Sequence, residues 1–157
     1  MSGTKHTPLL SQLLSTWIEG EKSEEYPLAN LSNAIGIIYQ NISDINWVGF
    51  YLFNQKNNEL VLGPFIGKPA VAIIAPGSGV VGKSFVASKT IVVDDVHKFS
   101  GHITCDVDSN SEIVVPIIDK NGNKIGVLDI DSPLLARFKN EEQSELEHFV
   151  QTLLEYI

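Results

Sequence analysis

The chain has 157 residues, a length that suits one folded domain built around one hydrophobic core. Hydrophobic residues make up 43% of it and charged residues 19%, an ordinary globular balance that excludes long disordered stretches. The net charge of -8 and the lack of clustered Lys and Arg exclude nucleic acid as the main partner, because phosphate binding needs basic side chains.

The single cysteine, Cys105, excludes an intrachain disulfide and therefore a disulfide-stapled secreted scaffold. Residues 1–7 lack the apolar segment of a signal peptide, and no apolar run approaches the ~20 residues needed to cross a bilayer. We therefore expect a cytoplasmic protein with no membrane partner, in which Cys105 is kept reduced.

Two helices are predicted at the N-terminal end. Thr7 is a suitable N-cap and Pro8 a suitable first helical residue. Apolar residues follow at helical spacing: Leu9, Leu10, Leu13, Leu14, Trp17 and Ile18. A second helix should begin near Pro27, and its predicted buried stripe is Leu28, Leu31, Ile35, Ile38 and Ile42.

From Asn46 the apolar period changes to two, which predicts a strand that places Trp47, Gly49, Tyr51 and Phe53 on one face. Five predicted elements follow along the chain: a returning strand over 59–65, a short strand over 71–75, a helix over 80–89, a strand over 90–93 and an irregular loop over 94–110. A second hairpin joins strands over 111–119 and 124–131 through an Asn-Gly turn.

The chain ends in a predicted helix. Asn140 can cap it, and Gln143 stands three residues later, as in a capping box. Its predicted buried stripe is Leu146, Phe149, Val150, Leu153, Leu154 and Ile157. Strands joined by tight hairpins between terminal helices predict an α+β fold with a central, mainly antiparallel sheet. The terminal helices should cover one sheet face and leave the other face, with the long loop, to form a pocket.

Cys105 is the first candidate for chemistry. It lies in a polar loop rather than in an apolar stripe, which favours an accessible, reactive thiol over a buried structural cysteine. A reactive thiol needs a positive neighbour or hydrogen-bond donors, and His97 and His102 are close in sequence, whereas Asp106 would oppose a thiolate.

Asp129 and Asp131 alternate with apolar residues on one strand and should share a face with Ile125 and Val127. Burying carboxylates without a partner is costly, so these acids either line a pocket, which we favour, or cap a neighbouring loop. Glu112 begins the paired strand and could converge on the same place. Crowded carboxylates raise one another's pKa, so one can stay protonated and donate a proton.

Trp47 and Tyr51 share a strand face and are either two core aromatics or the wall of a small site opposite the acids. Other signals are weaker. The five-residue spacing of His97 and His102 matches no established metal motif, and we expect no metal site. The GxGxxG stretch over 77–82 lacks the flanking features of a nucleotide site and more simply serves a tight turn.

Six stretches, in this order, resemble the free methionine-(R)-sulfoxide reductases, which have a GAF fold: residues 46–51, 62–70, 94–97, 101–106, 109–114 and 126–133. The likeness runs from about Trp17 to the C-terminus and implies a single GAF domain over 1–157. It implies reduction of the R-epimer of free methionine sulfoxide, with Cys105 attacking the sulfur and becoming a sulfenic acid. It also implies that Trp47, Tyr51, Glu112, Asp129 and Asp131 bind the substrate.

The chain departs from this family at two positions, where Val71 and Val81 stand in place of cysteines. The cysteine that would resolve the sulfenic acid is therefore missing. We expect no bound cofactor and an external thiol reductant, either glutathione or a thioredoxin-like redoxin; the family's habit suggests a homodimer. The alternatives are engineered valines, a GAF module that binds a small ligand without turnover, a peroxide sensor based on Cys105, and an interaction protein.

Overall fold

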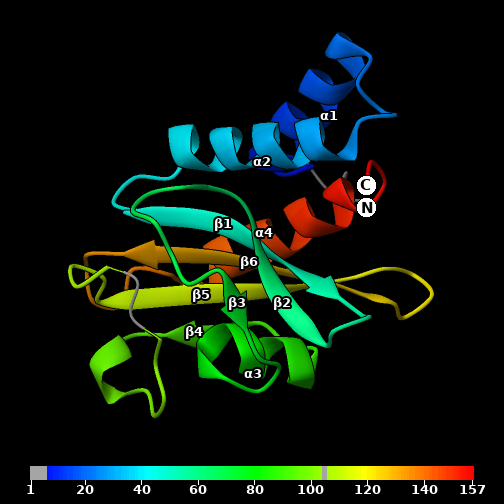
Figure 1. The fold of residues 1–157 in the computed structure, drawn as a ribbon. Coiled ribbons are helices and arrows are strands. Elements are labelled where there is room, and N and C mark those ends of the chain that lie inside the picture. The colour runs from blue at the N-terminus through cyan, green and yellow to red at the C-terminus, as the bar shows by residue number, and fades with distance from the viewer. Residues whose placement is uncertain (1–6, 104–105) are drawn as a thin grey trace, which may run out of the picture.

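The computed structural model describes residues 7–103 and 106–157. A six-stranded sheet forms the centre of the fold, with the strand order β3-β2-β1-β6-β5-β4 (Figure 1). Every neighbouring pair is antiparallel, which confirms the predicted α+β class with a central antiparallel sheet. The strands are β1 (Trp47–Asn54), β2 (Glu59–Ile66), β3 (Ile73–Ile74), β4 (Ile91–Val93), β5 (Ser111–Ile118) and β6 (Lys124–Ser132).

Helices cover the two faces of the sheet unequally. On one face α2 (Pro27–Asn41) and α4 (Asn140–Leu153) contact the sheet, and α1 (Leu9–Glu21) packs against both of them (Figure 1). On the opposite face lies α3 (Gly79–Ala87), followed after β4 by the 3-10 helix η1 (Val96–Lys98). The predicted placement of the terminal helices on one face is thus confirmed.

Strand alternation divides the apolar residues into two cores. Phe50, Leu128 and Ile130 point toward α2 and α4 and join the larger core. Trp47, Tyr51, Leu60, Phe85 and Val127 form the second core, between the sheet and α3. Because side chains alternate along a strand, Asp129 and Asp131 follow Val127 onto the α3 face.

The predicted helical stripes were too wide. Leu28 was expected to be buried and is 68% exposed, and Trp17, on the apolar face of the first helix, is 51% exposed. Leu9 is also exposed, while Leu10, Leu14 and Ile18 are buried. For α1 the reason is geometric: it packs on other helices rather than on the sheet, so only a narrow stripe of it is covered.

Two smaller predictions were also wrong. Ile125 packs with the larger core and not beside Val127, because the β5–β6 register shifts between Ile117 and Ile118. The N-cap of α4 is Lys139 rather than Asn140, and the residue at its third position is Glu142, whose carboxylate accepts the Lys139 N–H at 3.5 Å.

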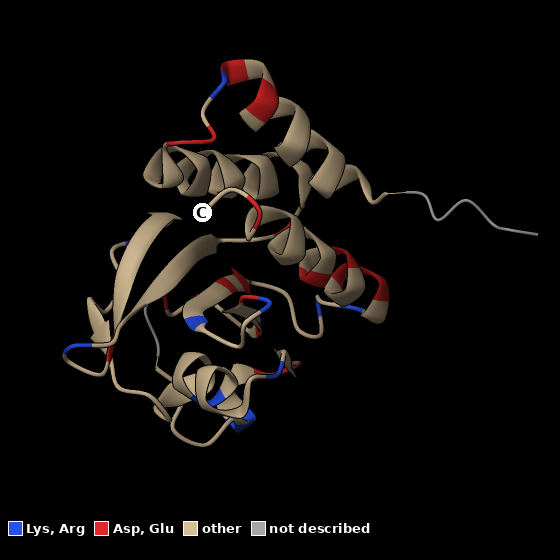
Figure 2. Cartoon of the chain, turned by 90° about the vertical axis from the view of Figure 1, so that its right-hand side faces the viewer, with Lys and Arg blue, Asp and Glu red and all other residues tan. Residues whose placement is uncertain are grey.

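Charge is distributed unevenly over the helices (Figure 2). Acidic residues colour the C-terminal end of α1 and much of α4, while Lys83 lies on α3. The acids in the first turn of α4, Glu141 and Glu142, favour that helix because its N-terminus carries partial positive charge. Within the ranges that the structure describes, no helix is both long enough and apolar enough to cross a bilayer.

Candidate active site

The strand register brings three predicted site residues into one row across the sheet. Trp47 of β1 lies opposite Asp131 of β6, and Asp131 lies opposite Glu112 of β5. Asp129 and Tyr51 lie on the same face, two and four residue pairs further along. The β5–β6 hairpin and β1, which is far from it in the sequence, therefore present their side chains to one place.

A small pocket lies on this face, between the sheet and the N-terminal end of α3. Its lining consists of Trp47, Tyr51, Ile74, Gly79, Val80, Val81, Ile103, Glu112, Asp129 and Asp131. Five of the six predicted site residues thus surround one cavity. The sixth, Cys105, lies outside the described residues; Ile103, two positions before it, reaches the pocket wall.

The aromatic side of the pocket is a short stack of rings. Trp47 is stacked with Tyr51 at 6.1 Å and with Phe65 at 5.5 Å between ring centroids. The Trp47 Nε1–H donates to the Lys68 carbonyl at 3.0 Å, and the Tyr51 hydroxyl donates to the Val71 carbonyl at 2.8 Å. These bonds satisfy the polar ends of both rings and fix their orientation, so the wall is rigid and mainly apolar.

Two glycines make room for the Trp47 ring. A Cβ atom on Gly49 would lie 2.5 Å from Cη2 of Trp47, and one on Gly67 would lie 2.4 Å from its Cδ1. Real Cβ atoms do not approach other carbons so closely. Gly67 also has φ +140°, a conformation that other residues rarely adopt. The backbone at both positions therefore determines where the indole lies.

The acidic side of the pocket is a cluster of Glu112, Asp129 and Asp131, all buried, with one oxygen of each within 4.8 Å of the others. Burial raises the pKa of Glu112 well above its usual range, and the charge of Asp131 raises it further. Burial likewise raises the pKa of Asp129, with Glu112 as the second cause. Because like charges crowded without water disfavour the ionised forms, both shifts favour protonated carboxyls in the cluster.

One oxygen in this cluster is unused. Asp129 Oδ1 is buried and has no hydrogen-bond partner among the residues that the structure describes. An unsatisfied buried acceptor costs about 1–3 kcal/mol, which a polar ligand in the pocket would recover. The spacing could also suit a cation, but a metal would have to displace the protons that the raised pKa values retain.

The two loop histidines separate in space. His97 lies outside the pocket lining, with Nε2 3.0 Å from Asn110 Oδ1. His102 Nε2 lies 3.3 Å from Glu112 Oε1. Burial lowers the pKa of His102 and raises the pKa of Glu112, so both shifts disfavour an ion pair at this contact. His102 was considered as a neighbour of Cys105 in the sequence, but its contact with the acids was not predicted.

The segment that begins at residue 106 is anchored by Asp106. Its buried carboxylate accepts the Asp108 N–H at 2.9 Å and the Lys68 ammonium at 3.2 Å. The backbone N–H of Asp108, together with hydrogen bonds from Lys68 and Asn46, holds the pKa of Asp106 below its usual range. Asp106 is therefore ionised, as the expectation that it opposes a thiolate requires, but Lys68 partly offsets its charge.

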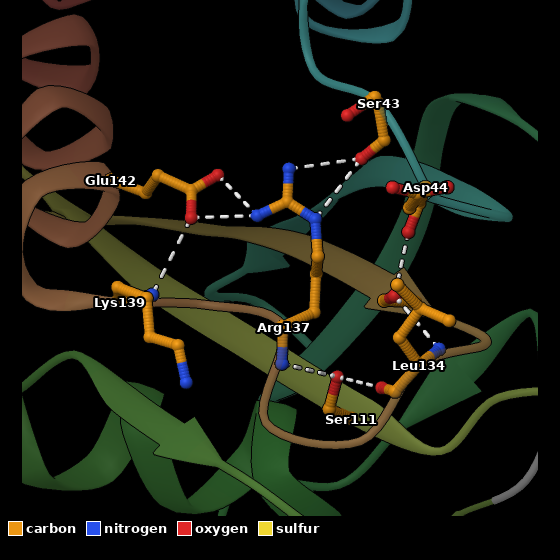
Figure 3. Close-up of polar contacts among 8 residues, drawn as sticks. Ser43, Asp44, Ser111, Leu134, Arg137, Lys139 and Glu142 are labelled. Carbon is orange, nitrogen blue, oxygen red and sulfur yellow. Dashed lines mark hydrogen bonds and ion pairs between the residues drawn. The ribbon is translucent and has the colours of Figure 1, made fainter.

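A second anchor ties the strand ends that carry the acids (Figure 3). Ser111, next to Glu112, donates to the Leu134 carbonyl at 2.5 Å, and Ser132, next to Asp131, donates to the Asp44 carbonyl at 2.6 Å. Arg137 donates from Nε and Nη2 to the Ser43 carbonyl and from Nη1 to the Glu142 carboxylate. This network was not predicted, because short polar residues in turns show no periodic pattern.

The two valines at the family's cysteine positions differ in their surroundings. Val81 is buried in the pocket wall at the start of α3. Val71 is 40% exposed and offers its carbonyl to Tyr51. Neither side chain can take part in thiol chemistry, so the pocket itself holds no second thiol among its described lining.

Comparison with known proteins gives a consistent result. The free methionine-R-sulfoxide reductase of Escherichia coli is 47% identical over 126 residues, 80% of this chain and 74% of that protein. The enzyme of the same name from Saccharomyces cerevisiae is 39% identical, covering 92% of this chain and 83% of its own length. No protein-family model matches the chain.

Solved structures are similar throughout. The structure of free methionine-R-sulfoxide reductase from Neisseria meningitidis in complex with its substrate is 35% identical and superposes with a TM-score of 0.85. The alignment covers 99% of this chain and 92% of that one. A GAF sensor protein from Burkholderia vietnamiensis, 43% identical with a TM-score of 0.81, covers 94% of both chains.

Proposed function

Since the chain belongs to the free methionine-R-sulfoxide reductase family of GAF-fold proteins, we propose that it reduces the R-epimer of free methionine sulfoxide to methionine. The observation that carries this proposal is the pocket in which an aromatic wall faces three buried acids, with one carboxyl oxygen unpartnered. Such a pocket suits a small molecule with an apolar methyl-sulfur end and polar groups beside it.

Cys105 is the proposed nucleophile. Its thiolate attacks the sulfoxide sulfur while a protonated carboxyl of the cluster gives its proton to the sulfoxide oxygen. The hydroxyl group then passes from the substrate sulfur to the Cys105 sulfur as the bond between the two sulfurs breaks, so methionine leaves as the thioether and Cys105 becomes a sulfenic acid. The raised pKa values of Glu112 and Asp129 support this assignment, since a proton donor must still hold its proton at neutral pH.

Trp47 and Tyr51 are the proposed wall for the methyl end of the substrate, and Glu112, Asp129 and Asp131 the proposed partners of its polar groups. The ring stack supports the first role because its polar atoms are already bonded to backbone carbonyls. The substrate therefore meets apolar ring surface there and not competing donors. The acids supply both acceptors and protons on the opposite side.

Regeneration requires a thiol from outside the chain. One external thiol forms a mixed disulfide with Cys105 and releases water; a second displaces Cys105 as thiolate and leaves as disulfide. This needs no bound prosthetic group, and glutathione or a redoxin supplies the two electrons. We place the reaction in the cytoplasm, where such thiols are kept reduced, and expect a homodimer, which sedimentation would test.

A single-turnover assay tests the proposal. Reduced protein mixed with an excess of free methionine-(R)-sulfoxide, without other thiols, should release about one methionine per chain and gain the mass of one oxygen on Cys105. The S-epimer and peptide-bound sulfoxide should release none, and Cys105→Ser should be inactive. Tight substrate binding without any methionine release would replace this proposal with that of a sensor.

A further inference from the structure

The proposed chemistry assigns no role to His102, a buried titratable group beside the pocket. Its side chain is 11% exposed, and Nε2 lies 3.3 Å from Glu112 Oε1. That distance is at the long end for an N–H···O hydrogen bond, and contacts of this kind shorten when substrate fills a site. A neutral imidazole has one N–H and one acceptor nitrogen, so the tautomer decides what the contact does.

The acids themselves indicate which tautomer is needed. Glu112 lies opposite Asp131 in the strand register, and one oxygen of each of the three acids lies within 4.8 Å of the others. A proton on Glu112 relieves the crowding best when it is directed at these neighbouring carboxyl oxygens. When Glu112 has given its proton away, its oxygens can only accept, and the contact with His102 is then favourable only if Nε2 carries the hydrogen.

We infer that His102 is a positioning residue: its Nε2–H is directed at Glu112 Oε1 and keeps the Glu112 proton on the side of the other two acids. When Glu112 gives up that proton, the same N–H stabilises the carboxylate that remains. Burial alone would make Glu112 a reluctant donor, and a donor hydrogen bond moves an acid back toward the working pH. The kinetic part of this inference rests on the proposed function; the tautomer does not.

Among the residues that the structure describes, the other groups around Glu112 do not replace this donor. From β6 it faces Asp129 and Asp131, which are acids, and from α3 the pocket receives Gly79, Val80 and Val81, which do not titrate. Within the described part of the chain, the nearest ammonium of α3, Lys83, is bonded to the Ser100 carbonyl. The imidazole is thus the group on the loop side with an N–H to offer.

Nitrogen-15 NMR of histidine-labelled protein at pH 7 tests the tautomer directly. The His102 signal, assigned by its loss in His102→Gln, should be that of a neutral ring protonated at Nε2. A ring protonated at Nδ1 only, or a charged imidazolium, would overturn the inference. This readout needs no turnover, so it decides the point even if the protein releases no methionine.

Single-turnover kinetics test the consequence. His102→Leu, which has no donor, should release methionine at least about tenfold more slowly, with a smaller change in substrate affinity. His102→Gln, which keeps an N–H near the Nε2 position, should stay within about threefold of the native rate. His97→Leu is the matched control and should be unchanged. Equal rates for the Gln and Leu variants would mean that His102 only fills space, against the inference.

Discussion

Asp129 illustrates what a buried acid costs the folded state. Its pKa is raised by burial first and by Glu112 second, so the folded protein binds that proton more tightly than the unfolded chain does. The stabilising effect of the proton is complete below the unfolded pKa and is lost as the pH rises through the raised, folded pKa. At pH 8 the buried carboxyl of Asp129 therefore lowers the free energy of unfolding.

Replacing this acid should reverse the effect. Asp129→Asn should raise the free energy of unfolding at pH 8, since a neutral amide has no charge to suppress on burial. The gain should shrink toward pH 4, where the native carboxyl is protonated anyway. Urea unfolding at both pH values measures it, and an equal gain at the two would show that charge is not the cause.

Gly49 is a second residue whose role is local. Gly49→Ala would place a methyl group against the Trp47 ring and the Phe65 side chain, so the indole must shift into the pocket. We expect substrate affinity to fall at least tenfold, measured by calorimetry in a Cys105→Ser background that prevents turnover. Gly36→Ala is the matched control: nothing lies near the added atom, and the helix should gain about 0.5–1 kcal/mol.

At the scale of elements, period-two patterning predicted the site well. The alternation in β1 and β6 placed Trp47 with Tyr51 and Asp129 with Asp131 before their register was known. The predicted face of Ile125 was wrong, because a register shift in β6 turns its side chain to the other face of the sheet. Such a shift cannot be seen in the pattern of apolar residues. The contact of His102 was not predicted either, because loop side chains are positioned by tertiary contacts and not by a repeat.

The helices show the opposite weakness of such patterns. An apolar stripe tells which side of a helix is buried but not how wide the covering surface is. Leu28 and Trp17 lie at the edges of their stripes and are exposed. The width of the buried stripe depends on the elements that pack against the helix and not on the helix sequence. Short strands such as β3 were likewise located but overestimated in length.

The Arg137 network joins the loops at the ends of these elements (Figure 3). Arg137→Met should lower the free energy of unfolding by about 1–3 kcal/mol, since it frees the Ser43 carbonyl and the Glu142 carboxylate. Lys139→Met, at the neighbouring cap position, should change it by less than about 0.5 kcal/mol. Thermal unfolding of both variants measures the difference, and equal effects would contradict this account of the network.

Over the whole molecule, the sheet separates stability from chemistry. The larger core between the sheet and the helices α1, α2 and α4 is apolar, whereas the α3 face contains every described acid of the pocket. A change in one layer is therefore expected to leave the other largely intact. That division was predictable from the order of elements, but the pocket's dimensions were not.

The presence of a single thiol also affects the reaction of the molecule as a whole. With no partner cysteine in the chain, steady-state turnover should rise linearly with external glutathione until methionine release limits it. Coupled glutathione reductase and NADPH absorbance give the rate. Mass spectrometry should show a glutathione adduct on Cys105 when the second thiol is withheld. A rate independent of glutathione and of added redoxins would argue against regeneration by external thiols.

The positions of the two tryptophans have a practical consequence. Trp47 is 1% exposed in the pocket wall, whereas Trp17 is 51% exposed on α1. Their fluorescence should therefore separate, with blue-shifted emission from the enclosed indole and red-shifted emission from the other. In a Trp17→Phe protein all remaining emission would come from the pocket, and its quenching by added sulfoxide would follow occupancy in real time without any label.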